Sequence, residues 1–474
     1  MKNRTLFNYV ILLLLIGAVS SCKLFKEPLQ TENKTTPKSY ATATDTANTA
    51  KVQWRTYFDD ENLVALIDTA LKHNQELKIT LQEIAMIRNE IRVRKSELLP
   101  NGTIVAGAGA DKSGKYTWNG LSEEDWKAGS GNTPYVGDFN VSAIFSWELD
   151  IWKKLRNAKK ATVARYFASI EGRNFLITNL IAEIADAYYE LEALDNQLEI
   201  IRQNITIQEN ALRIIKQQKE SSKVSQLAVN RFEAQLLNTQ NLQYEIMQQI
   251  VETENEINFL TGRFPAPIKR NAESFMTKVF AFYSAGIPSQ LLENRPDIRE
   301  AELELAASKL DVQVAKASFF PEVRINAATG LQAFNPVVWF HPEALLYNLS
   351  GELAAPLINQ AALKANYRNA GAKQAQAVFK YEQTVLKSFT EVVNELSGIA
   401  NYTKSFETKS HEVEILTQSI NVSDNLFKSA RADYIEVLLT QREALESKME
   451  LIEIKKKQLN AEINIYRALG GGWN

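Results

Sequence analysis

The side chains most often used in catalysis are few and scattered in this chain of 474 residues. Its three histidines, His73, His341 and His411, lie too far apart in the sequence to form a metal-binding motif. No glycine-rich phosphate-binding loop and no nucleophile motif stands out. The sequence therefore predicts a protein that is not an enzyme and that uses no metal and no cofactor.

One residue is placed for covalent modification, and it is Cys22, the only cysteine of the chain. A positively charged start and the apolar run 10–19 are typical of a signal peptide, and the run is too short to span a bilayer stably. Two small residues directly before Cys22 resemble a bacterial lipobox. We predict that 1–21 is a lipoprotein signal peptide and that Cys22 is acylated. The alternative is an ordinary signal peptide with an incidental cysteine.

Composition limits the partners of the chain. The formal net charge is -2 and the sequence pI is near 6.2, so nothing indicates the basic face that nucleic-acid binding usually needs. After Cys22, the stretch 22–51 is polar and rich in Thr, Asn and Lys, with two prolines. Such a composition predicts a lipid-anchored tether and not a folded domain. Lys23 is compatible with the outer membrane, because an Asp at this place would favour retention in the inner membrane.

Two periodicities meet within 139–219. Apolar and polar residues alternate over 139–149, which predicts an amphipathic strand. Further on, apolar residues recur every seven positions, at Ile184, Leu191, Leu198, Ile205 and Leu212. This heptad pattern predicts a long coiled-coil helix. A turn at 220–225 leads into a return helix, and we expect each long helix to have about 55–60 residues, or roughly 80–90 Å.

The order helix, strand, loop, strand, long helix, turn, long helix occurs twice. The first copy covers 52–265 and has an exposed loop at 111–134. The second covers 290–474 and has its loop at 331–344. A connector at 266–289 joins them. Local sequence echoes between the copies indicate an old internal duplication.

The four strands are amphipathic and about 9–11 residues long, which is the length that a tilted strand needs to cross a membrane. Four strands cannot close a barrel, and an open sheet edge is not tolerated in lipid. Closure therefore requires several copies, and three copies give twelve strands, an even number in the bacterial range. The long helices would then project into an aqueous compartment. From composition alone, two soluble hairpins packed on the helices are an equal alternative.

Short motifs favour the membrane interpretation. They are Trp54-x-x-x-Phe58, Trp147-Glu148-Leu149-Asp150-Ile151-Trp152, Asn294-Arg295-Pro296-Asp297-Ile298, Phe320-Pro321 and Ala468-Leu469-Gly470-Gly471-Gly472-Trp473. In these motifs, over essentially the whole mature chain, the sequence resembles the TolC-like outer-membrane factors, in their lipoprotein branch. The resemblance implies an α+β membrane protein in the outer membrane of a Gram-negative bacterium. It would be a homotrimer with a twelve-stranded β-barrel, continuous with a coiled-coil α-helical barrel in the periplasm.

The same resemblance implies a function. A TolC-like factor is the passive exit duct of a tripartite efflux pump, and its partners are a periplasmic adaptor, or membrane fusion protein, and an RND-type inner-membrane pump. One alternative is the outer-membrane component of a type I polypeptide secretion system. Another is a periplasmic coiled-coil adaptor lipoprotein, although an adaptor is expected to have one helical hairpin flanked by β-rich domains. The cargo cannot be inferred from the residues, because the same conduit serves many cargoes.

Both helical turns are candidate docking tips, because they lie farthest from the strands. The residues concerned are Ser222, Lys223, Val224, Ser225, Ala430, Arg431 and Ala432. The resemblance implies that they dock the adaptor or pump, and the alternative is that they are merely solvated turns. The family often has Gly where this chain has Ser222 and Ala430. We therefore expect both turns to adopt a conformation available to residues with a Cβ.

Two acidic residues near the second tip are candidate gate residues. Asp424 continues an apolar helical seam, where a carboxylate is costly unless it faces water or a partner. Three copies around one axis would repel each other and attract cations, which would tune a closed gate. Asp433 is the second candidate. The alternative for both is an exposed acid at a helix end.

Overall fold

The computed structural model describes residues 29–40, 47–112, 136–280, 284–356, 358, 360–429 and 431–473. They form two compact units. The first is built from Arg94–Ala161 and Ala307–Phe379 and contains the sheet. The second is built from Asn33–Val93, Thr162–Ala306 and Lys380–Asn474 and is helical. Within the described residues, no helix combines the length and the apolar character needed to cross a membrane.

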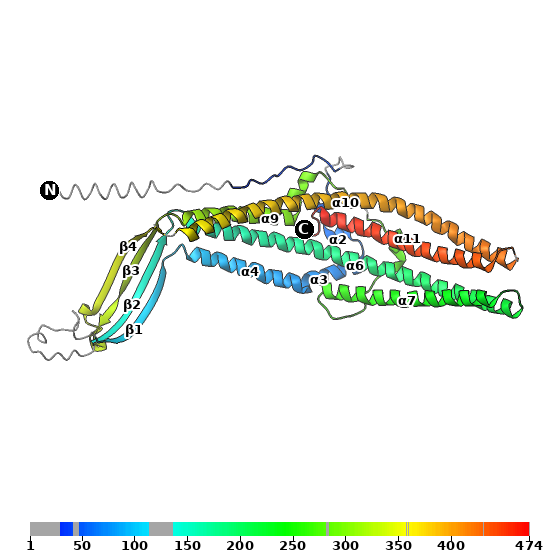
Figure 1. Cartoon of the computed structure of the whole chain (residues 1–474). Coiled ribbons are helices and arrows are strands. Elements are labelled where there is room, and N and C mark those ends of the chain that lie inside the picture. Colours follow the sequence, from blue (N-terminus) through cyan, green and yellow to red (C-terminus); the bar gives the residue numbers. More distant parts are fainter. Residues whose placement is uncertain are drawn as a thin grey trace, which may run out of the picture. The chain divides into compact units, whose positions relative to one another are not determined.

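The sheet of the first unit is antiparallel, in the order β1-β2-β3-β4 (Figure 1). The strands are β1 (Asn101–Asp111), β2 (Val136–Leu149), β3 (Glu322–Ala333) and β4 (Leu345–Ala354). Two strands from each half of the chain therefore join side by side, as the repeat predicts. The connection after β3 starts later than the expected 331, because the strand continues to Ala333. It contains two short turns, η4 (Pro336–Val338) and η5 (Pro342–Ala344).

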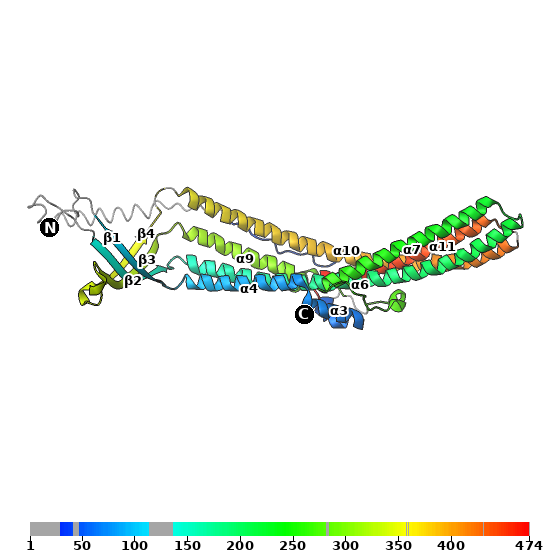
Figure 2. The same cartoon turned by 90° about the horizontal axis from the view of Figure 1, so that it is seen from below.

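Two antiparallel helical hairpins follow the strands (Figure 2). They are α6 (Lys154–Glu220) with α7 (Gln226–Leu260), and α10 (Ala361–Lys428) with α11 (Tyr434–Ala468). The expected length of 55–60 residues for every long helix is wrong: the first helices have 67 and 68 residues and the return helices 35 each. The return helices are short because each ends two residues before a glycine with positive φ, Gly262 at 69° and Gly470 at 90°.

The shorter helices are broken where the sequence predicts continuous ones. They are α3 (Glu61–His73), α4 (Gln75–Ser96), α8 (Leu291–Asn294) and α9 (Pro296–Ala317). At the first break, the side-chain amide of Asn74 donates to the carbonyl of Leu260 at 2.9 Å. At the second, the Arg295 guanidinium donates to the carbonyl of Ala468 at 2.8 Å. Each half of the chain therefore ties a helix break to the last residue of its own return helix.

We call the contact between each helix break and the end of its return helix a joint. Glycine is required at both joints. A Cβ on Gly262 would lie 2.4 Å from the carbonyl oxygen of His73, and one on Gly470 would lie 2.6 Å from that of Asn294. Both distances are shorter than van der Waals contact, and both glycines also have a left-handed backbone. The equivalent joints support the internal duplication.

Aromatic side chains fill the core of the second unit around α2 (Trp54–Tyr57). Tyr57 stacks on Phe280 and Tyr466, with ring centroids 5.3 and 4.3 Å apart, and Phe58 is fully buried. The Trp54-x-x-x-Phe58 motif therefore belongs to the core. The connector also contributes, because Phe275 in η2 (Ala272–Thr277) is fully buried.

The N-terminal stretch differs from the expected free tether. Residues 29–40 lie against α9 and α10 through side-chain and backbone hydrogen bonds. Further along, η1 (Thr49–Lys51) is fixed by hydrogen bonds to Ser284. Composition missed this because most of the contacts use backbone groups and polar side chains, which a tether also has, although Tyr40 is buried and stacks on Phe389. Cys22 lies outside the described residues.

Two buried carboxyls on α6 predict an unusual dependence of stability on pH. Glu192 is fully buried, and burial raises the pKa of its carboxyl to about 7. Burial likewise raises the pKa of Asp186 to about 7. Both values exceed those of the unfolded chain, near 4, so the folded protein holds these protons more tightly. Stability should therefore fall as pH rises from about 4 to about 7, and the loss should be complete above that window.

Glu192→Gln is expected to raise stability at pH 8 by about 2 kcal/mol and to flatten its pH profile, because the amide is neutral throughout. The measurement is the thermal denaturation midpoint in detergent from pH 5 to pH 8. Glu190→Gln, two residues earlier on the same helix and partly exposed, is the matched control. Equal profiles for wild type and Glu192→Gln would contradict the prediction.

Candidate channel surfaces and docking tips

One face of the sheet is apolar and uncovered. The register places Phe145 opposite Gly102 and Ala327, and Ala327 opposite Leu349, so the alternating apolar residues of all four strands share one face. Its large members include Ile104, Phe145, Trp147, Tyr347, Leu349 and Leu353, and all of them are exposed. Tyr347 is 82% and Leu349 77% exposed. A continuous apolar face of this kind is suited to lipid contact.

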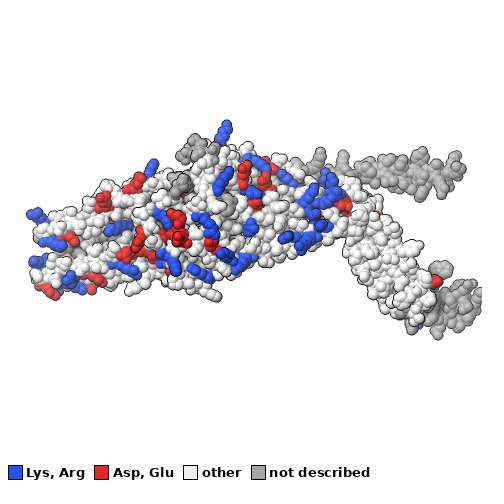
Figure 3. All heavy atoms as spheres, turned by 180° about the vertical axis from the view of Figure 1, so that it is seen from behind, with Lys and Arg blue, Asp and Glu red and all other residues white. Residues whose placement is uncertain are grey.

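The opposite face carries the polar side chains of the strands, which hydrogen-bond to one another, together with the apolar Val105, Ile144 and Leu346. Ser146 donates to the Asn326 amide oxygen at 2.8 Å, and Asn326 donates to Glu352 at 3.2 Å. Near the other end of the strands, Gln332 donates to Asp138 at 2.9 Å. Figure 3 shows that the visible surface of the strands has almost no Lys, Arg, Asp or Glu, whereas the helical surface carries many charges of both signs.

Aromatic residues and one lysine make the side-chain contacts where the strands meet the helices. The Trp152 indole donates to the carbonyl of Pro321 at 2.8 Å and stacks on Phe320. The Nζ of Lys154 lies 2.7 Å from Glu148 and 2.6 Å from Glu322. Indole and ammonium groups are the usual side chains of a membrane–water boundary. Two predicted motifs, 147–152 and 320–321, therefore meet here.

The predicted first tip is a hydrogen-bonded helix end. The amide of Ser222 donates to Lys219 and that of Lys223 to Gln218, both at 2.9 Å, and Ser222 has a φ of 56°. This is a Schellman turn, whose left-handed residue is usually Gly. The expectation of a backbone that readily accepts a Cβ is therefore wrong at Ser222, which adopts the glycine-type conformation. Ser225 then caps α7 by accepting from Ala228.

At the second tip, the end of α10 is closed by a hydrogen bond like that of Lys223 at the first tip. The Arg431 amide donates to the Leu426 carbonyl at 2.9 Å. Ala430 lies outside the described residues. The two tips lie beside each other (Figures 1 and 2), because one apolar cluster joins them. Its members include Leu212, Ile215, Val224, Phe232, Phe427, Tyr434 and Leu438. Ser222, Lys223, Ser225 and Arg431 are exposed, whereas Val224 and Ala432 are half-buried.

The two candidate gate residues are accessible to solvent. Asp424 is half-buried near the end of α10, and Asp433 is exposed at the residue before α11. Among the described residues, neither carboxylate has a cationic partner within 4.0 Å. Asp433 also makes no side-chain cap to α11. Both side chains are therefore free to interact with a partner or an ion.

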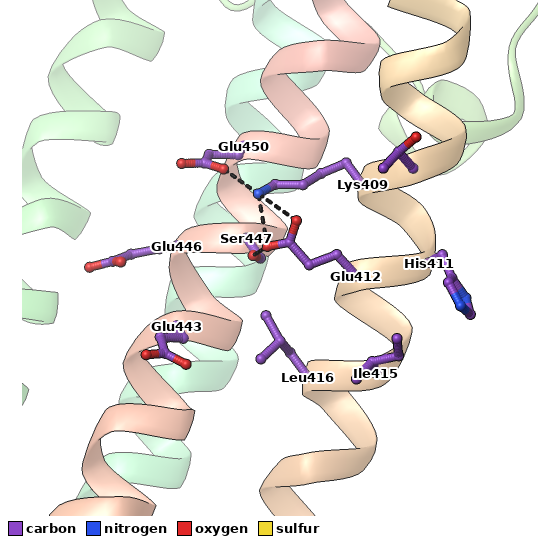
Figure 4. Close-up of a pocket in the computed structure, with 10 residues that line it drawn as sticks. Lys409, His411, Glu412, Ile415, Leu416, Glu443, Glu446, Ser447 and Glu450 are labelled. Atoms are coloured by element: carbon purple, nitrogen blue, oxygen red, sulfur yellow. Dashed lines mark hydrogen bonds and ion pairs between the residues drawn. The ribbon is translucent and has the colours of Figure 1, made fainter.

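Sequence reasoning missed an acidic groove of about 550 Å³ between α10 and α11 (Figure 4). Glu412, Glu443, Glu446 and Glu450 line it. Lys409 binds Glu450 and Glu412 at 2.5 and 3.0 Å, and these hydrogen bonds raise the pKa of Lys409. The sequence offered one signal for this groove: the spacing of Glu443, Glu446 and Glu450 places their side chains on one face of α11. His411, an exposed residue of α10, also lines the groove.

The comparison with known proteins decides between the membrane and soluble interpretations. The family model described as outer membrane efflux protein matches residues 66–263 and 287–471. The chain belongs to the outer membrane efflux protein family. It is therefore an outer-membrane efflux channel and not an enzyme. The predicted fold class, a long helical barrel combined with strands, is confirmed by the solved relatives.

Relatives of this outer membrane efflux protein match over most of their length. The solvent efflux pump outer membrane protein SrpC of Pseudomonas putida is 25% identical over 427 residues, which are 90% of this chain and 88% of SrpC. The probable outer membrane lipoprotein SilC of Salmonella typhimurium is 24% identical, covering 89% and 88% of the two chains. The solved open state of the Neisseria gonorrhoeae MtrE outer membrane channel has a TM-score of 0.82 at 21% identity, covering 94% and 98%.

Ser222→Gly is expected to stabilise the first tip by about 1 kcal/mol, because glycine adopts the left-handed conformation without the steric cost that serine pays. The measurement is hydrogen exchange of the amides at the end of α6, which should be slower in the variant. Ser221→Gly is the control, since Ser221 does not have a positive φ. Faster exchange in Ser222→Gly than in wild type would contradict the prediction.

Proposed function

We propose that the chain is the outer-membrane exit duct of a tripartite efflux pump and works as a homotrimer. The observation that carries this proposal is the sheet, which has one exposed apolar face and, among the described residues, no strand neighbour beyond β1 or β4. Three copies pairing β1 with β4 form a twelve-stranded barrel without a free edge. The apolar face then contacts lipid and the polar face lines the lumen.

A periplasmic adaptor docks at the two tips, and an RND-type inner-membrane pump supplies the cargo. Support for docking comes from the exposed polar side chains of Ser222, Lys223, Ser225 and Arg431, which a single apolar cluster presents at one end of the hairpins. The acidic groove beside Lys409 offers a complementary surface for basic side chains of such an adaptor. Asp424 and Asp433 act at the gate, since their carboxylates have no ion-pair partner among the described residues.

Cys22 is acylated and anchors the mature chain in the outer membrane. The lipobox-like sequence supports this, and one relative, SilC, is named a probable lipoprotein. The cargo is a class of small molecules or ions. Relatives are named for efflux of solvents, toluene and cations and for export of pyoverdine. None of these four relatives is named for a secreted polypeptide, so small-molecule efflux is preferred to type I secretion.

The test of the duct is purification of the full chain in detergent, followed by native mass and planar-bilayer recordings. We expect a heat-modifiable trimer with single-channel conductance. A monomer that is soluble after Cys22→Ala would overturn the proposal and favour the adaptor lipoprotein. Susceptibility profiling of a deletion strain then identifies the cargo class.

Docking and gating have separate tests. Combined Lys223→Ala and Arg431→Ala should abolish efflux in cells while the trimer still assembles. Unchanged efflux would exclude docking through these side chains. Asp424→Ala should change the conductance of the closed channel, and an unchanged conductance would exclude Asp424 as a gate residue.

A further inference from the structure

Basic residues gather where the helices adjoin one end of the sheet. The register places four residues in one row near this end, which are Asn101, Ser146, Asn326 and Ser350. At most six residues separate each of these strand ends from α4, α6, α9 or α10. The connections and adjoining helix ends have twelve Lys or Arg and three Asp or Glu, within 94–100, 150–161, 307–321 and 355–379. This local excess of nine positive charges contrasts with a net charge of -2 for the whole chain.

Each of the four helices has one exposed lysine within a turn of the end that adjoins the strands. These residues, which we call the lysine belt, are Lys95 of α4, Lys153 directly before α6, Lys316 of α9 and Lys364 of α10. Among the described residues, none of the four ammonium groups has a carboxylate within 4.0 Å. Lys154, by contrast, is paired with Glu148 and Glu322. The lysine belt is therefore available to anions from outside the chain.

Lys153 occupies its place at a conformational cost. Its φ is 61°, in the left-handed region that glycine adopts freely and that asparagine tolerates better than lysine. The backbone is fixed on both sides, since Trp152 donates to the Pro321 carbonyl and Asn157 donates to the Lys153 carbonyl at 2.9 Å. Glycine or asparagine would suit this backbone better, so the turn does not explain the lysine side chain. Residues held in such conformations cluster at functional sites.

The lysine belt borders an apolar surface. Near this end of the sheet, the exposed apolar side chains are those of Trp147 and Leu353 on the strands and of Leu99 and Ile151 in the connections. Figure 3 shows Lys and Arg side chains gathered on the helices where they adjoin the uncharged surface of the strands. An apolar surface bordered by ammonium groups matches a phospholipid, whose acyl chains contact the former and whose phosphate contacts the latter.

We propose that the lysine belt binds the phosphate groups of anionic phospholipids in the periplasmic leaflet of the outer membrane. This inference rests on the proposed function, in which the apolar face contacts lipid and the helices extend into the periplasm. Every belt member lies within four residues of a helix end, or roughly 6 Å, which is less than the Debye length of about 8 Å. Lys373, twelve residues after the start of α10, lies roughly 18 Å along that helix and is outside this range.

The test compares two lipids in contact with the protein. The full chain is reconstituted into phosphatidylcholine vesicles that contain brominated phosphatidylglycerol or brominated phosphatidylcholine, because bromine quenches the fluorescence of tryptophans that touch the lipid. We expect the wild type to favour phosphatidylglycerol by at least about fivefold at low salt. The ratio should fall to about one in the combined variant Lys95→Gln, Lys153→Asn, Lys316→Gln and Lys364→Gln. A wild-type ratio of one would overturn the proposal.

A matched control removes the same charge from the second unit. The combined variant Lys72→Gln, Lys219→Gln, Lys269→Gln and Lys404→Gln changes four exposed lysines and should keep the wild-type ratio. An equal loss in both variants would show a general effect of net charge and would overturn the lysine belt.

Single variants of Lys153 separate its charge from its backbone. Lys153→Asn should lower the lipid ratio without lowering the thermal denaturation midpoint, because asparagine tolerates the left-handed conformation. Lys153→Arg should keep the ratio. An unchanged ratio in Lys153→Asn would exclude Lys153 from the lysine belt.

Trimer assembly and single-channel conductance, measured on the same preparations, separate this inference from the proposed function. Wild-type protein without trimer or conductance would overturn the exit duct. A conducting trimer whose lipid ratio is the same in the wild type and in the combined belt variant would overturn the lipid site alone. Lost efflux in cells at an unchanged lipid ratio would assign the lysine belt to a protein partner and would likewise overturn the lipid site.

Discussion

Replacing Arg295 with alanine is expected to destabilise the folded chain by about 3–5 kcal/mol. The side chain is 4% exposed and binds three groups. Its guanidinium pairs with Asp297 at 2.7 Å and with Glu391 at 2.8 Å, and it also donates to the carbonyl of Ala468. Removal would leave the Asp297 carboxylate without its ion-pair partner, Glu391 with only a 3.7 Å pair to Lys387, and the Ala468 carbonyl without this hydrogen bond. It would also release the joint between α8, α9 and the end of α11.

Thermal denaturation in detergent, followed by circular dichroism, measures this effect. Arg442→Ala is the control, because Arg442 is half-exposed and forms only a 3.6 Å pair with Glu446, so less than about 1 kcal/mol is expected. Arg295→Lys should be intermediate, since an ammonium group cannot reproduce the two-pronged pairing with Asp297. A loss for Arg295→Ala no larger than that for Arg442→Ala would refute the structural role.

Replacing Leu349 with arginine is expected to prevent assembly in the outer membrane. Leu349 lies in the middle of β4 on the apolar face and is 77% exposed in the isolated chain. A charged residue on the lipid face near the bilayer midplane costs about 2–4 kcal/mol, and a trimer would carry three such residues. The fraction of heat-modifiable trimer in outer-membrane preparations measures the effect.

The matched control is its neighbour Asn348, whose side chain alternates to the polar face. Asn348→Arg should assemble like wild type and change only the ion preference of the channel, because its charge is directed into the lumen. Equal assembly of Leu349→Arg and Asn348→Arg would contradict the assignment of the apolar face to lipid.

The sheet could be predicted from the sequence because its signal is local. Alternation over 139–149 defines the faces of β2, and the repeat supplies the matching strands. The break at Asn74 could not be predicted, because Asn is tolerated in helices and the break depends on a partner far along the chain. The break at Arg295 does have a local signal, because Pro296 follows it and disfavours a helical conformation at the residue before it. The length of α6 was underestimated because 154–183 packs without a heptad pattern.

Some parts of the candidate site could be predicted from the sequence and others could not, because only some of them have a local signal. The tip turns were located correctly, since a helical pattern stops and restarts there. The left-handed backbone of Ser222 was not foreseen, because sequence indicates such a conformation only where glycine occupies it. The acidic groove depends on how α10 packs on α11, which no single helix reveals.

The matching joints also indicate where the two copies of the repeat came to differ in length after the duplication. Asn74 and Arg295 are 221 residues apart, whereas Gly262 and Gly470 are 208 apart. The difference of 13 residues equals the difference between the two strand connections, which have 24 residues after Asp111 and 11 after Ala333. The other segments between the joints add up to the same length in both copies. Net insertion or deletion therefore accumulated in the strand connections, which are where new sequence is most easily inserted.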